Sequence, residues 1–455
     1  MPDNDDRVTP ARGAGEFEPA RGAGGSEPAR GTGGFPLLRL RRAGALLDLP
    51  WELRLADWPA TLQFRALPVG PSRHLVRFLV VKGDLLALKE EPIDVAEREY
   101  DVLTHLERVG LPAVIPIGIA EQATTDSAIL VTEYLGHSLQ FRRLLSRFPL
   151  GPGPYRDRLL DAMAWLLVDL HRGGVFWGDC SLANTLFRRD GDRIQAFLVD
   201  AETSEVHPSL SDGQRAYDLE ILVENLGYGL ADVAMLQDRP EDLDGAVEAA
   251  EKVRDRYLVI WRELHLEPRL PAGDRHAIRS QLRRLNDLGF AVDEIEVVPT
   301  ESGSAVQLRV TTTNRAFHAH ELERLTGIRA LEGQARLLLN DLREYRAWLE
   351  SYDRRPVGEQ EAADRWLRDV LEPSLDAILP TVGAKRDPLQ AYCDVLEEKW
   401  ILSELAGHDV GLEAAIQAYL RLGAPAPEDD RGTDSTIALD IDWSGGLDTP
   451  DSMAG

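Results

Sequence analysis

Residues 171–203 constrain the fold and the chemistry of this chain more than any other stretch. They read HRGGVFWGDCSLANTLFRRDGDRIQAFLVDAET and carry three polar residues, Asp179, Asn184 and Asp200, beside apolar runs. Asp179 and Asn184 lie in a short loop that follows an apolar helical pattern and precedes a strand-like run, and Asp200 ends a second apolar run. Two carboxylates and one carboxamide in this layout predict a site whose oxygen atoms hold metal-bound phosphates.

Composition narrows the class of protein. The chain has 455 residues, of which 44% are hydrophobic and 28% charged, so it is long enough for two or three folded domains. Acidic residues number 77 against 51 basic ones, and the net charge of -26 argues against a surface that binds nucleic acid or anionic lipid. The two cysteines, Cys180 and Cys393, are too few for a disulfide framework or a zinc site, and no apolar run is long enough to span a bilayer. We therefore expect a cytoplasmic protein with no membrane span and no nucleic-acid partner.

Both ends of the chain have a composition that does not support a hydrophobic core. A nine-residue unit rich in Gly, Pro, Ala and charge begins at Pro10, Pro19 and Pro28. Residues 424–455 are acidic and rich in Pro, Gly and Asp. Such segments bury too little apolar surface to offset chain entropy. We therefore predict a disordered repeat tail at 1–37 and an acidic flexible tail at 424–455.

The region after the first tail is predicted to form a small sheet with one helix. Residues 74–81 and 85–89 are strand-like and flank a Lys-Gly-Asp turn, which indicates a hairpin. Residues 95–109 have helical spacing. Two further strands are predicted at 113–117 and 128–135. The expected order is therefore strand, strand, helix, strand, strand.

Four segments resemble motifs of the protein-kinase-like superfamily. Residues 170–187, LHRGGVFWGDCSLANTLF, are similar to the catalytic loop of that superfamily, and residues 198–203, LVDAET, are similar to its metal-binding aspartate after a strand. Residues 98–112 resemble the helix of the small lobe. Residues 215–222, RAYDLEIL, resemble a later helix whose aspartate, here Asp218, braces the catalytic loop.

Within this superfamily, residues from about 68 to 226 resemble the bacterial lipopolysaccharide (Kdo and heptose) kinases, with kinship to aminoglycoside phosphotransferases and RIO-type kinases. The resemblance implies an α+β, two-lobed protein-kinase-like fold with a small β-rich N-lobe and a helical C-lobe, which we place at 38–228. It also implies ATP- and Mg²⁺-dependent transfer of the γ-phosphoryl group to a hydroxyl acceptor. The acceptor is open, and a saccharide or lipopolysaccharide-like glycan is the class that the family suggests.

The resemblance gives each candidate site residue an expected role. Asp179 is the expected catalytic base or hydroxyl orienter, and Asn184 and Asp200 are the expected magnesium ligands. Lys89 would contact the α- and β-phosphates and would pair with Glu99. The further candidates for binding the cofactor are Ser72, Arg73, Glu133 and Leu135.

Two positions depart from the family pattern. Trp177 stands where the family usually has His before Gly-Asp, and this change concerns the geometry of the loop more than its chemistry. The candidate phosphate-covering loop, 69–74, has one glycine and a proline in place of GxGxxG. Its backbone amides, with Ser72 and Arg73, still supply donors for phosphate.

Each candidate also has a purely structural explanation. Lys89 can be solvated at its strand end, and Glu99 can be a favourable charge in the first turn of a helix. Asp179 and Asn184 are residue types that are common in turns. Cys180 is expected to pack, because the motif offers it no histidine base. The alternative function is a nucleotide-binding pseudokinase that acts as a protein-interaction module, and the third is a scaffold without nucleotide.

The sequence after Gly227 has no metal or nucleophile motif and is mainly helical. It resembles a domain of unknown function that follows such kinase-like modules in a family of bacterial proteins, and we place this mainly helical C-terminal domain at 229–423. We expect the domain to help form or cover the acceptor site, or to bind a protein partner. Strands are predicted at 295–298 and 305–313, and helices at 247–266, 274–288, 321–326, 331–351, 361–377, 389–406 and 411–421.

Overall fold

The computed structural model describes residues 38–424 with short gaps. The gaps are residues 42, 68–72, 123–124, 142–143, 145–152, 237, 266–268, 272–279, 281–282, 284, 287–289, 291, 300–304, 313–314 and 384–385. The predicted tail at 1–37, all but Ala424 of the predicted tail at 424–455, Ser72 and most of the predicted helix at 274–288 lie outside the described residues. No helix in the described part of the chain is both long and apolar enough to cross a membrane.

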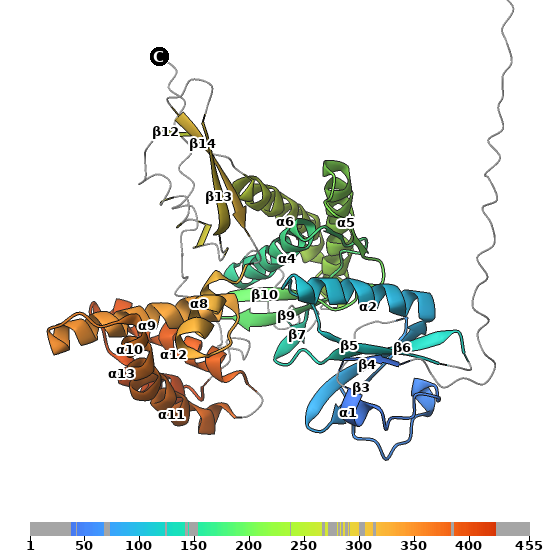
Figure 1. Ribbon diagram of the computed structural model, residues 1–455, viewed down its shortest axis with the longest axis horizontal. Coiled ribbons are helices and arrows are strands. Elements are labelled where there is room, and N and C mark those ends of the chain that lie inside the picture. The colour runs from blue at the N-terminus through green and yellow to red at the C-terminus, as the bar shows by residue number, and fades with distance from the viewer. Residues whose placement is uncertain are drawn as a thin grey trace, which may run out of the picture.

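The N-lobe is a six-stranded antiparallel sheet with one long helix, α2, against it (Figure 1). Its strand order is β1-β5-β6-β4-β3-β2. The β3–β4 hairpin turns at Lys82 and Gly83, which both have positive φ, and such a turn matches the twist of the strands that it joins. The elements of this lobe are β1 (Leu38–Leu40), α1 (Ala43–Leu46), η1 (Leu55–Asp57), β2 (Phe64–Arg65), β3 (Leu75–Val81), β4 (Asp84–Pro92), α2 (Ile93–Arg108), β5 (Pro116–Glu121) and β6 (Ser127–Glu133).

The C-lobe is built around α4, whose apolar side chains are buried along most of its length. A helix that is apolar on most sides is stable only inside a core, and α5 and α6 supply that core by packing with α4. Two small sheets complete the lobe, with strand orders β10-β9-β7 and β11-β8. The elements are β7 (Ser138–Gln140), α4 (Pro154–Arg172), β8 (Val175–Phe176), β9 (Thr185–Asp190), β10 (Arg193–Leu198), β11 (Glu205–Val206), α5 (Asp212–Leu236), η2 (Pro240–Asp242) and α6 (Leu243–Leu264).

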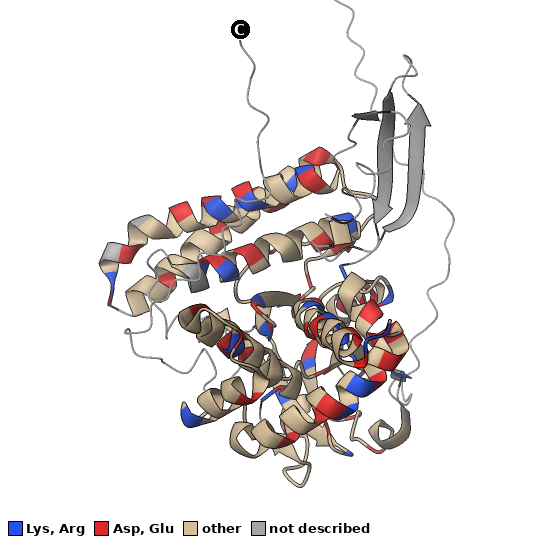
Figure 2. Ribbon diagram, turned by 90° about the vertical axis from the view of Figure 1, so that its left-hand side faces the viewer, with Lys and Arg blue, Asp and Glu red and all other residues tan. Residues whose placement is uncertain are grey.

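The chain continues into a three-stranded antiparallel sheet, of order β12-β14-β13, and then into a helical part with its own core (Figure 1). Acidic and basic residues are interspersed along these helices (Figure 2). The elements are β12 (Arg269–Pro271), β13 (Val292–Pro299), β14 (Ala305–Thr312), α8 (Phe317–Thr326), α9 (Glu332–Asp353), α10 (Glu359–Trp366), the π-helix η3 (Leu367–Leu371), α11 (Glu372–Val382), α12 (Pro388–Ala406) and α13 (Leu412–Arg421).

Two predicted elements differ from the structure. The strand predicted at 113–117 begins only at Pro116, because the residues before it pair with the C-lobe: Ala113 forms a bridge with Leu198, and the Val114 amide donates to the Leu198 carbonyl over 3.0 Å. The single helix predicted at 361–377 is interrupted by the π-helix. Pro373, in the first turn of α11, has no N–H to continue an α-helical hydrogen-bond ladder, which accounts for the interruption.

The C-terminal helices are attached to the C-lobe at the turn between β9 and β10. The buried carboxylate of Asp190 accepts hydrogen bonds from the backbone amides of Gly333 and Gln334, both at 2.8 Å, in the first turn of α9. The Gly191 amide donates to Gln390 Oε1 over 2.8 Å, and Gln390 Nε2 donates back to the Gly191 carbonyl over 2.9 Å. The turn thus supplies acceptors for first-turn amides of α9, which the apolar N-cap residue Leu331 cannot supply.

Ion pairs surround this buried contact. Three arginines and three aspartates link the β9–β10 hairpin to α9 and α12, with N–O distances from 2.5 to 2.7 Å. Because the hairpin strands begin after Asn184 and end before Asp200, the C-terminal helices hold the same hairpin that carries these two candidate ligands. The pairs are Arg188–Asp387, Arg189–Asp394 and Arg336–Asp192.

Candidate functional site

Lys89 joins the two lobes through ion pairs. Its ammonium Nζ lies 2.8 Å from Glu99 Oε2 and 3.1 Å from Asp200 Oδ1. The predicted pairing with Glu99 is therefore present, whereas Glu97 lies on the exposed side of α2 and pairs with Arg39. Burial alone would lower the pKa of Lys89, but the nearby carboxylates raise this pKa above its ordinary value. The lysine therefore stays charged and holds strand β4, helix α2 and the segment after β10 together.

Local structure explains how Glu99 comes to face the lysine. Helix α2 buries one face that includes Ala96, Glu99 and Val102, and on this face Glu99 is 1% exposed. Residues three and four apart share a helix face, so an apolar stripe carries the glutamate inward with it. The second carboxylate oxygen of Glu99 accepts a hydrogen bond from the Ala201 amide over 3.3 Å. Glu99 is thus fixed from both lobes.

Two side-chain amides orient Asp179, one from the loop after β8 and one from α5. Asn184 Nδ2 donates to Asp179 Oδ2 over 3.0 Å and to the Asp179 carbonyl over 3.2 Å. Asn225 Nδ2, from α5, donates to Asp179 Oδ1 over 2.9 Å. Each carboxylate oxygen therefore accepts one amide hydrogen bond, which fixes the plane of the group.

The pairing of β9 with β10 brings Asn184 next to Asp200. Thr185 and Leu198 are paired across the ladder, and the Val199 amide donates to the Asn184 carbonyl over 3.1 Å. Asp200 follows directly and reaches Lys89, so Lys89, Asp200, Asn184 and Asp179 form one connected group. The structure thus brings together Lys89, Asp200 and the loop that carries Asp179 and Asn184, which are three separate segments of the sequence.

Asp218 lies beneath this loop, as the sequence suggests. Its carboxylate accepts backbone hydrogen bonds from Trp177 over 2.7 Å and from Gly178 over 2.8 Å. Gly178 has φ +80°, and a Cβ there would lie 2.7 Å from the Thr203 carbonyl oxygen, so glycine is required. Trp177 is fully buried and its carbonyl accepts from Ser204 Oγ over 3.1 Å. The indole of Trp177 is therefore enclosed in the core, while the backbone of this residue is braced by Asp218.

His171 and Cys180 also contact Asp218. His171 Nε2 lies 3.0 Å from Asp218 Oδ2, and its Nδ1 lies 2.7 Å from the Tyr257 hydroxyl. Burial lowers the pKa of His171, and this effect exceeds the opposite effect of Asp218. Burial raises the pKa of the Cys180 thiol well above its ordinary value, so Cys180 packs as an uncharged group. These groups support the loop from its buried side.

The remaining predicted cofactor residues are not part of the connected group. Ser72 lies outside the described residues, and Arg73 is exposed just before β3. Glu133 ends β6 and pairs with Leu86 in the sheet, whereas Lys89 pairs with Leu130. Leu135 packs against the C-lobe core. Glu133 and Leu135 therefore lie at the end of the N-lobe sheet and just after it, where the chain passes to the C-lobe.

Sequence reasoning missed three polar groups near the site. Asn225 is seven residues after Asp218 on α5, a spacing that puts both on one helix face, and this spacing is a signal that could have found it. Glu91 is two residues after Lys89 on β4 and therefore on the same face of the strand. Glu202 lies two residues after Asp200, and its role depends on a tertiary contact with His74 that no local pattern predicts.

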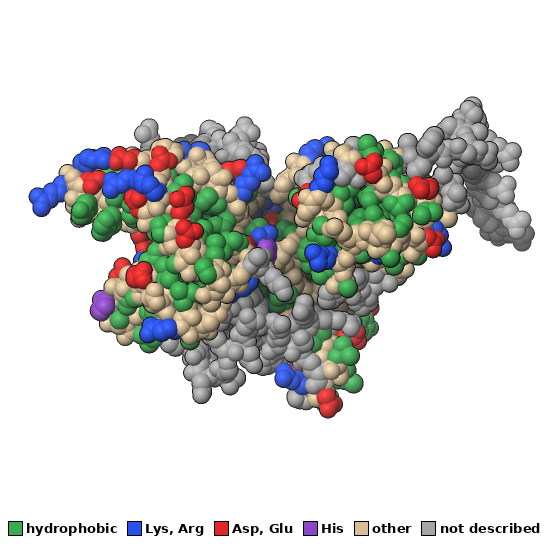
Figure 3. All heavy atoms as spheres, turned by 90° about the horizontal axis from the view of Figure 1, so that it is seen from below, with side chains coloured by type: hydrophobic (Ala, Val, Ile, Leu, Met, Phe, Trp, Pro, Cys, Tyr) green, Lys and Arg blue, Asp and Glu red, His purple; other side chains and the backbone are tan. Residues whose placement is uncertain are grey.

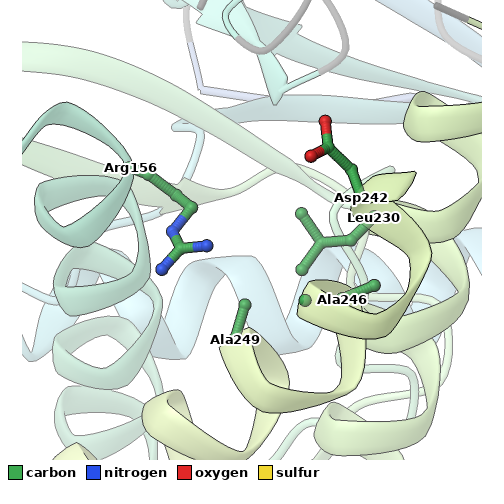
Figure 4. Close-up of a pocket in the computed structure, with 6 residues that line it drawn as sticks. Arg156, Leu230, Asp242, Ala246 and Ala249 are labelled. Carbon is green, nitrogen blue, oxygen red and sulfur yellow. The ribbon is translucent and has the colours of Figure 1, made fainter. Parts of the chain in front are cut away.

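The surface has a small pocket in the C-lobe and a hollow between the N-lobe and the C-terminal helices (Figure 3). Figure 4 shows a small pocket between α4, α5 and α6, which includes none of the candidate residues. Seen from below, the surface is hollowed between the N-lobe and the C-terminal helices, and both acidic and basic side chains occur on this face (Figure 3). The residues that line the pocket are Arg156, Leu230, Asp242, Gly245, Ala246 and Ala249.

The donor set of the connected group fits Mg²⁺. Asn184 uses its Nδ2 to bind Asp179, which directs its amide oxygen away from that contact. Asp200 accepts from Lys89 and from the Glu202 amide through Oδ1, and its side chain is 28% exposed. A carboxylate and a carboxamide oxygen are hard ligands, and Mg²⁺ takes few protein ligands when phosphates and water supply the rest.

Two family profiles match successive parts of the chain. Residues 82–237 match the profile of the Lipopolysaccharide kinase (Kdo/WaaP) family, and residues 259–422 match that of a domain of unknown function, DUF4032. A solved structure described as "WaaP in complex with acyl carrier protein" aligns with 43% of this chain and 90% of its own at 19% identity, with a TM-score of 0.30. No match was found among curated proteins. The chain thus carries a segment that matches the Kdo/WaaP lipopolysaccharide kinase family, followed by a segment that matches DUF4032.

Proposed function

We propose that the chain is a cytoplasmic kinase that transfers the γ-phosphoryl group of ATP to a hydroxyl acceptor, with a saccharide or glycan hydroxyl as the acceptor class. The observation that carries the proposal is the connected group, in which Lys89 contacts both Glu99 and Asp200 while Asn184 contacts Asp179. A purely structural ion pair between Lys89 and Glu99 needs neither an oriented Asp179 nor a second amide on it. The match of residues 82–237 to a kinase family supports the same reaction type.

Each residue has one task in the proposed reaction. Lys89, held by Glu99, binds the α- and β-phosphates, and Asn184 and Asp200 hold Mg²⁺, which neutralises phosphate charge when bound. Asp179 accepts the proton of the acceptor hydroxyl as the oxygen attacks the γ-phosphorus and the bond to the β-phosphate oxygen breaks. Positioning and electrostatic stabilisation supply most of the rate in such a transfer. ADP and a phosphorylated acceptor leave.

The two-domain division supports a role for the C-terminal part. The predicted division into 38–228 and 229–423 falls within α5, which packs with α4 and α6 in the C-lobe core. We therefore propose that the catalytic domain includes α5 and α6, and that the C-terminal domain after them forms or covers the acceptor site or binds a protein partner. Its attachment to the β9–β10 hairpin supports this assignment, because the hairpin carries Asn184 and Asp200 at its ends.

Consumption of ATP by the full chain tests the proposal. Asp179→Asn keeps the size of the side chain but removes the proton acceptor, and we expect a loss of about 100-fold or more in kcat. Glu99→Gln should also lower the rate, because Lys89 loses its buried partner, while Glu97→Gln on the exposed side of the same helix should leave the rate within about twofold of wild type. Magnesium-dependent ATP consumption that is equal in wild type and Asp179→Asn would contradict the assignment.

Nucleotide binding separates the kinase from the pseudokinase. A pseudokinase would bind ATP through Lys89 and Asp200 and would show no ATP consumption with any acceptor. An acceptor screen of saccharides, glycans and small metabolites therefore accompanies the rate measurement. Mg²⁺-dependent stabilisation by ATP, together with no phosphorylated product across the screen, is the outcome that would replace the kinase by the pseudokinase.

A further inference from the structure

His74, Glu91 and Glu202 form a second cluster of potential metal ligands on the N-lobe side of Lys89. One ligand atom from each residue lies within 4.8 Å of the others, and His74 Nε2 is 3.1 Å from Glu202 Oε2. The three residues come from three segments, since His74 precedes β3, Glu91 lies on β4 and Glu202 follows β10. The pairing of β3 with β4 explains why His74 lies near Glu91. Leu75 pairs with Glu90, and His74 and Glu91 continue this register by one residue.

Glu91 is the residue that points to a ligand. Its side chain is completely buried, and only one of its carboxylate oxygens lies close to a described cation. Lys89 Nζ lies 2.9 Å from Glu91 Oε2 as an ion pair, which leaves Oε1 without a donor in the described part of the chain. A buried carboxylate oxygen that has no donor is costly, and such groups are usually paired or bound to a cation.

The charges around Lys89 also leave room for a cation. Four carboxylates, those of Glu91, Glu99, Asp200 and Glu202, lie within 3.8 Å of the single ammonium. The single ammonium is thus shared among several carboxylates. A divalent ion bound by His74, Glu91 and Glu202 would add positive charge there without displacing Lys89 from Glu99 or Asp200.

We propose that His74, Glu91 and Glu202 bind a divalent transition-metal ion, with Mn²⁺ as the representative ion, separate from the Mg²⁺ ligands Asn184 and Asp200. One imidazole nitrogen and two carboxylates favour such an ion over Mg²⁺, which prefers oxygen ligands alone. The ion ties the start of β3 to the segment after Asp200, and so fixes the N-lobe against the C-lobe. The site does not depend on the proposed phosphoryl transfer, because it needs neither ATP nor an acceptor.

Titration of the full chain with Mn²⁺ in the absence of nucleotide tests the site, with free Mn²⁺ counted by electron paramagnetic resonance. Wild type should bind Mn²⁺, and His74→Ala and Glu202→Gln should each weaken that binding by more than about tenfold. Both side chains are 20% exposed, so the variants are expected to fold, which thermal melting checks. Glu97→Gln, on the exposed side of α2 and outside both sites, is the matched control and should leave nucleotide-free binding unchanged.

Two results would overturn the inference. The first is an absence of Mn²⁺ binding by wild type at millimolar ion concentration. The second is binding that survives His74→Ala and Glu202→Gln but disappears in Asn184→Ala, which would place the ion with the candidate Mg²⁺ ligands instead. Mn²⁺ binding by a chain that consumes no ATP would leave this site standing and would refute only the proposed function.

Discussion

Removal of the Asp190 carboxylate should open the junction between the C-lobe and the C-terminal helices. Asp190→Ala leaves the buried amides of Gly333 and Gln334 without their acceptor, and these amides begin α9. A buried donor left unsatisfied costs about 1–3 kcal/mol, and a lost helix cap costs about 0.5–2 kcal/mol. Two amides lose their acceptor, but water that enters the site and the removal of a buried charge offset part of the free-energy cost. We therefore expect a net cost of about 3 kcal/mol.

Asp192 gives a matched control in the same turn. It forms an ion pair with Arg336 at 2.7 Å, both side chains are 24% exposed, and it caps no described helix. Pairs of this kind contribute about 1 kcal/mol or less. Asp192→Ala therefore removes the same kind of charge from the same hairpin at much smaller cost. The contrast isolates the buried cap from the general effect of charge.

Hydrogen exchange of the first turns of α9 measures the difference locally, which avoids assuming that this multidomain chain unfolds in one step. Every 1.4 kcal/mol changes an equilibrium tenfold, so exchange there should accelerate by about 100-fold in Asp190→Ala and by less than about fivefold in Asp192→Ala. Equal acceleration in the two variants would show that Asp190 acts as one surface charge among several, and would refute the capping argument.

Three further predictions concern other contacts. Gly333→Ala places a Cβ 2.2 Å from the Asp190 carbonyl oxygen and should destabilise the fold by about 1–3 kcal/mol. Gly227→Ala, in an open position of α5, should stabilise the fold by about 0.5–1 kcal/mol. Melting temperatures of the two variants that shift in the same direction would contradict this. Burial lowers the pKa of His171 below its ordinary 6.5, so protonation favours the unfolded chain and stability should fall as pH drops through about 6.5. The melting temperature should therefore fall less between pH 7 and pH 5 in His171→Gln than in wild type. An equal fall in the two proteins would refute the assignment. Asn225→Ala should lower kcat about tenfold with little change in the KM for ATP, because Asn225 orients Asp179; a change confined to KM would place Asn225 in nucleotide binding.

Local patterns predicted the parts of the site that local geometry determines. Lys89 lies on the strand predicted at 85–89, which the structure extends to Pro92, and Glu99 lies on the apolar face of the following helix. Their meeting follows from these two local patterns and the resemblance to kinases. The loop from Asp179 to Asn184 was predicted in the same way, because it is a continuous segment between an apolar helix and a strand.

Contacts between distant segments were not predictable from one sequence. No local pattern marks Asp190 as a helix cap, because the amides that it accepts, those of Gly333 and Gln334, are more than 140 positions away. Glu332 likewise caps α8 by accepting the amides of His318 and Ala319, both at 3.0 Å. A helix that is capped from another segment shows no capping residue at its own start, so the usual sequence signal is missing.

Binding of ATP with and without Mg²⁺ tests most directly whether Lys89, Asn184 and Asp200 form a nucleotide site. Calorimetric titration of wild type should give binding that strengthens at least about tenfold when Mg²⁺ is present. Asp200→Asn should abolish that magnesium effect, and Lys89→Met should weaken binding under both conditions, while Glu97→Gln should match wild type. Equal affinity for ATP in wild type, Asp200→Asn and Lys89→Met, or no binding at millimolar ATP, would contradict the account.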